Sequence, residues 1–307
     1  MEKKTERIMS WFDGLGLSLL WTRPEGEIKG VLQISHGMCE HKERYLPFME
    51  YMAEQGYAAV IHDHRGHGKS VKKKEDLGYF YGGRDKGLVE DLHQVTCWIK
   101  ERFPGSPVYM LGHSMGTLAA RTYLKEYDGE LTKLILTGPP SANPAVDLGL
   151  TLARLQRKIW GGRYRSREIQ ALAFGPYAAR FPGEGSGSAW ICSDKEVVKK
   201  YDDSEYCGFV FTADGFLGLF LLLKETYSTK GWKMRNPDLP VLFLGGEKDP
   251  CIGGGRRFVK QLQFLKKVGY RKVTGRMYPN MRHEILNETG KEEVYANIAA
   301  YLSKQVF

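Results

Sequence analysis

The stretch Pro107-Val108-Tyr109-Met110-Leu111-Gly112-His113-Ser114-Met115-Gly116 decides the fold. Its first half is a short apolar run, typical of a strand buried on both faces of a parallel sheet. The residues that follow, 117–121, favour a helix. Ser114 therefore stands on a sharp strand-to-helix turn in a G-x-S-x-G pattern, where a strained backbone projects the hydroxyl for nucleophilic attack. The flanking glycines leave room for the neighbouring strand and helix.

Similar apolar runs recur along the chain and alternate with amphipathic helical patterns. We expect strands at residues 17–22, 31–35, 58–63, 108–112, 134–137, 241–245 and 273–278. We expect helices near residues 45–55, 88–103, 258–265 and 294–302, each with one apolar stripe that can pack on a sheet. This alternation predicts the α/β class, with a mostly parallel central sheet flanked by helices.

The alternation stops between about residues 143 and 236, where helix-like segments are separated by glycine and proline breaks. We interpret this stretch as a helical cap inserted between two strands. The predicted division is a first core segment at 1–140, a cap at 141–236 and a second core segment at 237–307.

Two segments of the predicted cap can each be interpreted in two ways. Residues 216–223 are apolar all round, which suits a buried helix, one wall of an acyl-chain pocket, or both; Phe216 and Phe220 are the predicted substrate contacts. Residues 148–160 form a basic amphipathic pattern, which suits a solvated cap helix or a transient contact with a membrane surface.

A serine nucleophile needs a general base, and the base needs an acid to orient it. After a G-x-S-x-G turn of this kind, the partners follow in the order Asp or Glu, then His. Of the eight histidines, His283 alone lies after Ser114, so it is the predicted base. The acid is expected at the end of the 241–245 strand, where Asp249 is the candidate and Glu247 its local rival.

The negative oxygen of a tetrahedral intermediate needs two N–H donors. One is the Met115 N–H, next to the nucleophile. The other is expected in the loop after the 31–35 strand, where Gly37 permits a tight turn and the Met38 N–H can point at the site.

At this point the chain resembles the monoacylglycerol lipase and lysophospholipase branch of the α/β-hydrolases, a group classed with the serine aminopeptidase-like hydrolases. The resemblance covers nearly the whole chain, from about residue 17 to 302. It is carried by His36-Gly37-Met38-Cys39-Glu40-His41 with Arg44, Asp63-His64-Arg65-Gly66-His67-Gly68, the G-x-S-x-G turn, Gly246-Glu247-Lys248-Asp249-Pro250 and His283-Glu284-Ile285-Leu286.

The resemblance implies hydrolysis of lipid-like carboxylic esters without a metal or other cofactor. It also implies that Glu40 and Arg44 lie near a pocket for the polar head group. A second histidine that the family places three residues after the catalytic one is Leu286 here. This departure broadens the expectation to short-chain carboxylesterases, and an acyltransferase, in which an alcohol replaces water, stays open.

Other classes of function are less compatible with the sequence. The net charge is +9, but the basic residues are dispersed and no nucleic-acid-binding motif is present. The His62-Asp63-His64 segment places its aspartate differently from metallo-hydrolase motifs, so we predict no metal site there. A non-catalytic binding protein would not need to keep all three residues of the triad.

The cysteine content and the apolar runs lead us to expect a cytoplasmic protein. Five cysteines at wide spacings suit reduced thiols rather than a disulfide framework. The charged N-terminal residues lack the apolar segment of a secretory signal. No apolar run approaches the roughly 20 residues needed to span a bilayer. The sequence gives no indication of the oligomeric state.

Overall fold

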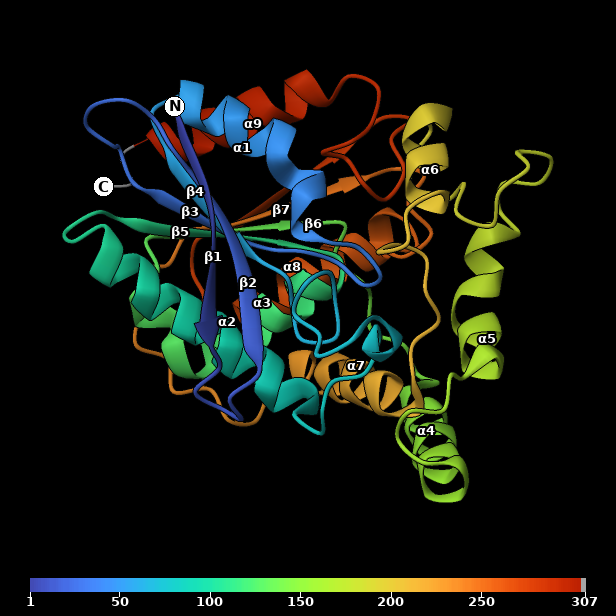
Figure 1. Ribbon diagram of the computed structural model, residues 1–307. Coiled ribbons are helices and arrows are strands. Elements are labelled where there is room, and N and C mark those ends of the chain that lie inside the picture. Colours follow the sequence, from blue (N-terminus) through green and yellow to red (C-terminus); the bar gives the residue numbers. More distant parts are fainter. Residues whose placement is uncertain (305–307) are drawn as a thin grey trace.

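An eight-stranded sheet forms the centre of the computed structural model, which describes residues 1–304 (Figure 1). The strand order is β1-β2-β4-β3-β5-β6-β7-β8. The six strands from β4 to β8 in this order are parallel to one another, whereas β1 pairs antiparallel to β2 and β2 antiparallel to β4. The strands are β1 (Glu2–Met9), β2 (Gly16–Arg23), β3 (Val31–Ser35), β4 (Ala58–His62), β5 (Val108–His113), β6 (Lys133–Thr137), β7 (Val241–Gly246) and β8 (Val273–Tyr278). The predicted α/β-hydrolase fold class is confirmed.

Helices cover both faces of the sheet, as Figure 1 shows. On one face lie α1 (Leu46–Glu54) and α9 (Lys291–Ser303), and on the other α2 (Arg84–Arg102), α3 (Met115–Tyr127) and α8 (Gly255–Val268). Successive side chains of β6 divide between the two layers: Leu134 and Leu136 join the cluster with α2 and α3, and Ile135 joins the cluster with α1 and α9.

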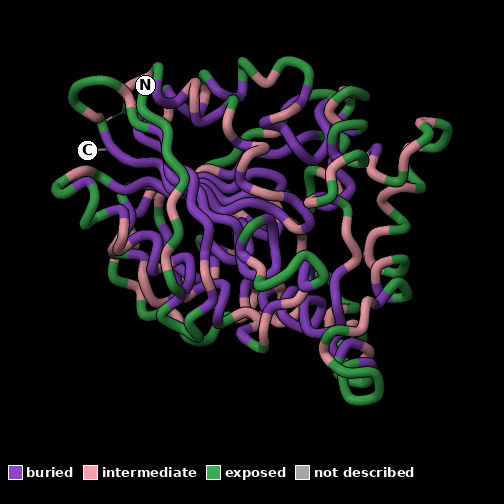
Figure 2. Tube along the Cα trace, in the orientation of Figure 1, coloured by how far each residue is buried: buried purple, intermediate pink, exposed green. Residues whose placement is uncertain are grey.

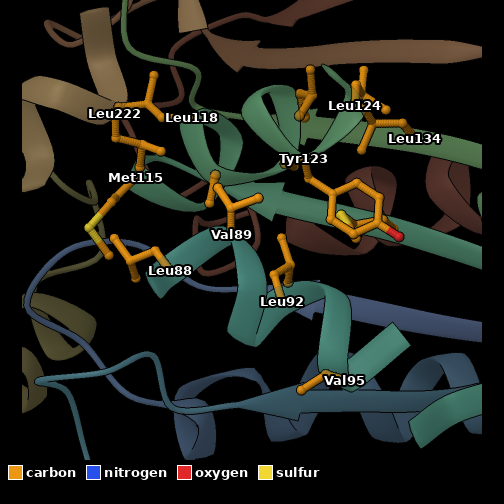
Figure 3. Packing of buried hydrophobic residues seen from close by; sticks show 14 of the residues in the cluster. Leu88, Val89, Leu92, Val95, Met115, Leu118, Tyr123, Leu124, Leu134 and Leu222 are labelled. Carbon is orange, nitrogen blue, oxygen red and sulfur yellow. The ribbon is translucent and has the colours of Figure 1, made fainter. Parts of the chain in front are cut away.

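The apolar stripe of α2 packs against α3 in the larger of these clusters (Figure 3). Leu88 and Leu92 of α2 are fully buried, as are Tyr123 and Leu124 of α3. Because α3 starts at the residue after Ser114, this packing fixes the helix that carries the nucleophile.

The seven predicted strands all form, with ends that differ by at most one residue from those expected. The strand β1 is not among those expected from the sequence. Its segment, Glu-Lys-Lys-Thr-Glu-Arg-Ile-Met, is mostly exposed because it is an edge strand, and its charged side chains discourage pairing with other chains. Such a strand carries no apolar run from which it could be predicted.

Four helices lie between β6 and β7, within the stretch predicted as a cap. They are α4 (Val146–Trp160), α5 (Arg167–Ala178), α6 (Lys195–Asp202) and α7 (Ala213–Thr226). The helix α7 packs on α2 and α3 and in turn carries α4, so it belongs to the large core cluster. Helices α4 and α5 lie at the outer edge of the molecule and are largely exposed (Figures 1 and 2). The division at residues 140 and 236 stays a prediction, and residues 305–307 of the second core segment lie outside the described residues.

Within residues 1–304, no helix has the length and apolar character needed to cross a bilayer. The five cysteines are free thiols. The cytoplasmic location stays a prediction.

Candidate active site

Ser114 sits on the turn between β5 and α3 with backbone angles φ 50° and ψ −117°. A positive φ is costly for a residue with a side chain, and it is the strain expected of a nucleophile turn. Packing enforces it. A Cβ atom on Gly116 would lie 1.9 Å from the Ser35 carbonyl oxygen, and one on Gly112 would lie 2.6 Å from the Gly116 carbonyl oxygen. Both positions therefore require glycine.

The predicted acid and base lie at the carboxyl ends of neighbouring strands. Asp249 follows β7 and His283 follows β8, and the His283 Nδ1 lies 2.8 Å from Asp249 Oδ2. Both side chains are buried. Burial opposes the charged imidazole, but the Asp249 carboxylate outweighs it and raises the pKa of His283 above its ordinary value. Glu247, the rival acid, is exposed.

The loop after β3 carries Met38, and the first turn of α3 carries Met115, the two residues expected to supply the oxyanion donors. Met38 and Met115 both line the cavity that contains Ser114. The Gly37 N–H donates to Glu40 Oε1 at 2.5 Å, and the Tyr45 hydroxyl donates to the same oxygen at 2.9 Å. Glu40 therefore holds the loop in shape from within, in addition to lining the cavity.

A cavity of about 330 Å³ opens above the turn and is lined by both Ser114 and His283. Its apolar part comes from α3, α5 and α7, and its polar part includes Glu40 and Glu284. Of the two aromatic residues predicted to contact substrate, Phe220 lines the cavity, whereas Phe216 is fully buried and packs against Phe211 and Phe220. The apolar lining includes Leu118, Ala171, Phe174, Leu219, Phe220 and Leu223.

The sequence pattern of the serine aminopeptidase S33 family matches residues 26–290, and this range contains all of the site residues above. The chain belongs to this family. This match and the lipase relatives described next confirm the resemblance predicted from the sequence and the enzyme class of an ester hydrolase.

Relatives of this S33 hydrolase include lipases that act on lipid esters. It is 26% identical over 287 residues to a monoacylglycerol lipase of Mycolicibacterium smegmatis, covering 92% of this chain and 91% of that one. It is 32% identical over 133 residues to the human monoglyceride lipase, covering 43% of this chain and 42% of that one. A carboxyl esterase from Bacillus coagulans, solved with glycerol, shares the fold with a TM-score of 0.88, 24% identity and 98% coverage of both chains.

Arg44 of the S33 hydrolase is held between two carboxylates. Its Nη1 donates to Glu40 Oε2 at 2.7 Å and to Glu284 Oε1 at 2.8 Å, and its Nη2 donates to Glu284 Oε2. The guanidinium also lies 4.9 Å from the centre of the Tyr201 ring. Because Glu284 follows His283, this network joins the oxyanion loop to the loop of the general base. The head-group role expected for Glu40 and Arg44 stays a prediction.

The histidine cluster of the second family motif is packed inside the S33 hydrolase. Burial lowers the pKa of His62 to about 3 and that of His67 to about 4, so both rings are neutral. Asp63, between them in sequence, accepts a hydrogen bond from the buried Lys42 Nζ at 2.7 Å. This segment is a buried structural turn.

The residue before the base is anchored to the loop between α5 and α6, a contact that the sequence does not predict. Arg282 donates to both carboxylate oxygens of Glu184 and to the carbonyl oxygens of Ala189 and Cys192. Its side chain is almost completely buried. The position of His283 is therefore fixed partly by the loop between α5 and α6.

The residue after the base is anchored to the same loop, at residues 184–193. The Glu284 N–H donates to the Ile191 carbonyl oxygen at 2.7 Å. The Trp190 ring lies 4.9 Å from the His283 ring, centre to centre, and also lines the cavity. No sequence signal marks these contacts, because they join segments about 90 residues apart.

Proposed function

We propose that this protein cleaves lipid-like carboxylic esters through an acyl-enzyme on Ser114. The observation that carries the proposal is the buried Asp249–His283 pair beside a cavity that also exposes a strained serine. The oxyanion donors are the N–H groups of Met38 and Met115.

The reaction runs in two halves. His283 accepts the Ser114 proton as the serine oxygen attacks the ester carbonyl, and then gives that proton to the departing alcohol. In the second half, His283 accepts a proton from water, which attacks the acyl-enzyme, and returns it to the serine as the carboxylic acid leaves. Asp249 stabilises the imidazolium in both halves.

The cavity supports a substrate with an apolar acyl chain and a small polar alcohol. Its apolar walls suit an acyl chain, because ligand sites are mostly apolar with a few placed polar groups. The relative from Mycolicibacterium smegmatis, which matches over nearly the whole chain, is named for a substrate of this kind, a monoacylglycerol. Leu286 is buried in the core, and we infer from its lack of a polar group that glycerol recognition is looser than in a dedicated monoacylglycerol lipase.

A labelling experiment and a substrate panel test this function. A fluorophosphonate probe should label the wild type and not Ser114→Ala, and EDTA should leave the activity unchanged. In contrast, a metal-dependent hydrolase would lose activity in EDTA and would not react with the probe. A binding protein would neither react with the probe nor hydrolyse esters. Rates on p-nitrophenyl esters of increasing chain length, beside a monoacylglycerol and a lysophospholipid, identify the substrate. A short-chain optimum would favour the carboxylesterase, and esters formed with an added alcohol would favour the acyltransferase.

We propose in addition that the cap touches an anionic lipid surface while the substrate enters. The stripe of α4 predicted from the sequence faces outward, with basic residues beside it, and a basic amphipathic helix of this kind binds at such surfaces. The exposed apolar side chains are Leu148, Leu155, Ile159 and Trp160 of α4 and Leu172 of α5, and the basic neighbours are Arg154, Arg157 and Lys158.

A sedimentation assay tests this surface. The protein should sediment with phosphatidylglycerol vesicles more than with phosphatidylcholine vesicles, and less so at high salt. The variant Leu155→Ser/Ile159→Ser should sediment less and keep its rate on soluble esters. Equal sedimentation of the variant and the wild type would contradict this surface.

A further inference from the structure

A buried thiol lies beside the Asp249–His283 pair. The Cys251 N–H donates to Asp249 Oδ1 at 2.7 Å, so the turn after β7 holds this cysteine close to the carboxylate. One ligand atom from each of these three residues, the Cys251 Sγ, an Asp249 oxygen and a His283 nitrogen, lies within 4.8 Å of the other two. All three residues are buried, yet Cys251 and His283 line the cavity and are therefore reached from solvent.

A thiolate, an imidazole and a carboxylate are together the ligand types that Zn²⁺ takes in proteins. Metal–ligand bonds of about 2.0–2.3 Å place the ligand atoms of a tetrahedral site roughly 3.5 Å apart. Because the three ligand atoms are at most 4.8 Å apart, bringing them to that spacing requires movements of at most about 1 Å. Rotation of the Cys251 side chain and a small opening of the Asp249–His283 contact supply movements of that size.

We propose that Cys251, Asp249 and His283 form a binding site for a thiophilic divalent cation, Zn²⁺ or Cd²⁺, and that occupation of the site inhibits the enzyme. The Cys251 thiol gives its proton to water as the sulfur–metal bond forms. The His283 proton moves from Nδ1 to Nε2 as Nδ1 takes the metal, and the Asp249 carboxylate exchanges its hydrogen bond to Nδ1–H for a bond to the metal. With a proton on Nε2, the imidazole no longer accepts the proton of Ser114.

The inhibition rests on the proposed function, whereas the binding does not. The Ser114→Ala variant therefore serves for a binding titration, read by the ultraviolet absorption of the cadmium–thiolate bond. We expect one such band to saturate with one equivalent of Cd²⁺. This band should disappear in Ser114→Ala/Cys251→Ser. In Ser114→Ala/His283→Gln, its saturation should need at least about tenfold more Cd²⁺. Even the loss of a residue that only hydrogen-bonds to a metal ligand costs about 10–100-fold in metal affinity.

Cys97 provides the matched control. Its Sγ lies 3.6 Å from His93 Nε2 on α2, so it offers a thiol and an imidazole. Within residues 1–304, no carboxylate oxygen completes a set of three ligand atoms with this pair within 4.8 Å. The Cys97→Ser change should leave the cadmium band and the inhibition as they are. A band that persists without Cys251 and disappears without Cys97 would overturn the proposal.

Inhibition is measured with each variant compared to its own rate without metal, because Cys251 lines the cavity. Zn²⁺ should inhibit the wild type and Cys97→Ser, EDTA should restore the rate, and Mg²⁺ should have no effect. Cys251→Ser should need at least about tenfold more Zn²⁺. If this variant does not fold, blocking the wild-type thiol with a methylthio group provides the same comparison. Equal sensitivity with and without a free Cys251 thiol would refute the proposal, and an enzyme inactive on esters would still report binding by absorption.

Discussion

Replacing Arg44 by methionine should destabilise the protein in a way that depends on pH. Methionine has an apolar side chain of similar length, so the change removes the cation between Glu40 and Glu284 while still filling most of its space. The exposed fractions of the Arg44, Glu40 and Glu284 side chains are 12%, 3% and 6%. Removing one partner of a buried ion pair typically costs about 3–5 kcal/mol, because the remaining charge is left unpaired in a poor solvent. We expect a loss of this size near pH 8.

The direction of the pH dependence follows from the two carboxyl groups. Burial alone would raise the pKa of Glu284, but Arg44 outweighs it and holds this pKa below its ordinary value. Glu284 thus contributes stability above its unfolded pKa, and that contribution is lost as the pH falls through its folded pKa. Burial raises the pKa of Glu40 above its ordinary value even beside Arg44. Without Arg44, this pKa rises further, and burial and mutual repulsion raise the folded pKa of Glu284 as well. The free-energy cost of burying these two unpaired carboxylates is then absent below the pKa of glutamate in the unfolded chain, about 4.3. It grows as the pH rises above that value.

Urea unfolding at pH 5 and pH 8 measures both effects. The loss caused by Arg44→Met should be at least about 1 kcal/mol smaller at pH 5, since each proton taken up on folding changes stability by ~1.4 kcal/mol per pH unit. The control Arg44→Met/Glu284→Gln removes one of the stranded charges and should recover part of the loss at pH 8. A loss below 1 kcal/mol, or an equal loss at both pH values, would refute this account of the network.

Three further predictions concern catalysis. Ser114→Ala should lower kcat by about 10⁶-fold and Asp249→Asn by roughly 10⁴-fold in steady-state assays, and a variant that keeps more than a tenth of the activity would contradict the triad. The kcat/KM of the wild type should fall on the acidic side with an apparent pKa above the ordinary histidine value. The reason is that Asp249 favours the protonated form of His283, which cannot act as a base. A pH–rate profile with a lower apparent pKa would count against this. Arg282→Lys and Glu184→Gln should each lower kcat by about tenfold, the effect of 1.4 kcal/mol, with little change in KM. A rise in KM alone would mean that their contact serves substrate binding rather than the position of His283.

The amino-acid sequence is sufficient to predict the local parts of the site. The strand, glycine and helix signals around Ser114 are contiguous, so they predict the turn without knowledge of the rest of the chain. His283 follows by elimination because no other histidine lies beyond the nucleophile. The order of these parts along the chain, with a strand before each, predicts their meeting at one edge of the sheet.

Tertiary structure decided everything that depends on pairing between distant segments. Arg44 and Glu284 are 240 residues apart, and nothing in either segment specifies the other as its partner. The same holds for Arg282 and Glu184. The outward face of α4 shows most clearly what the sequence cannot predict. Its apolar periodicity predicts a helix with one apolar side. Periodicity is a property of one helix, however, whereas burial depends on what packs against that helix. In α4 the residues that contact the core are Leu150 and Ala153, and the predicted apolar side faces outward.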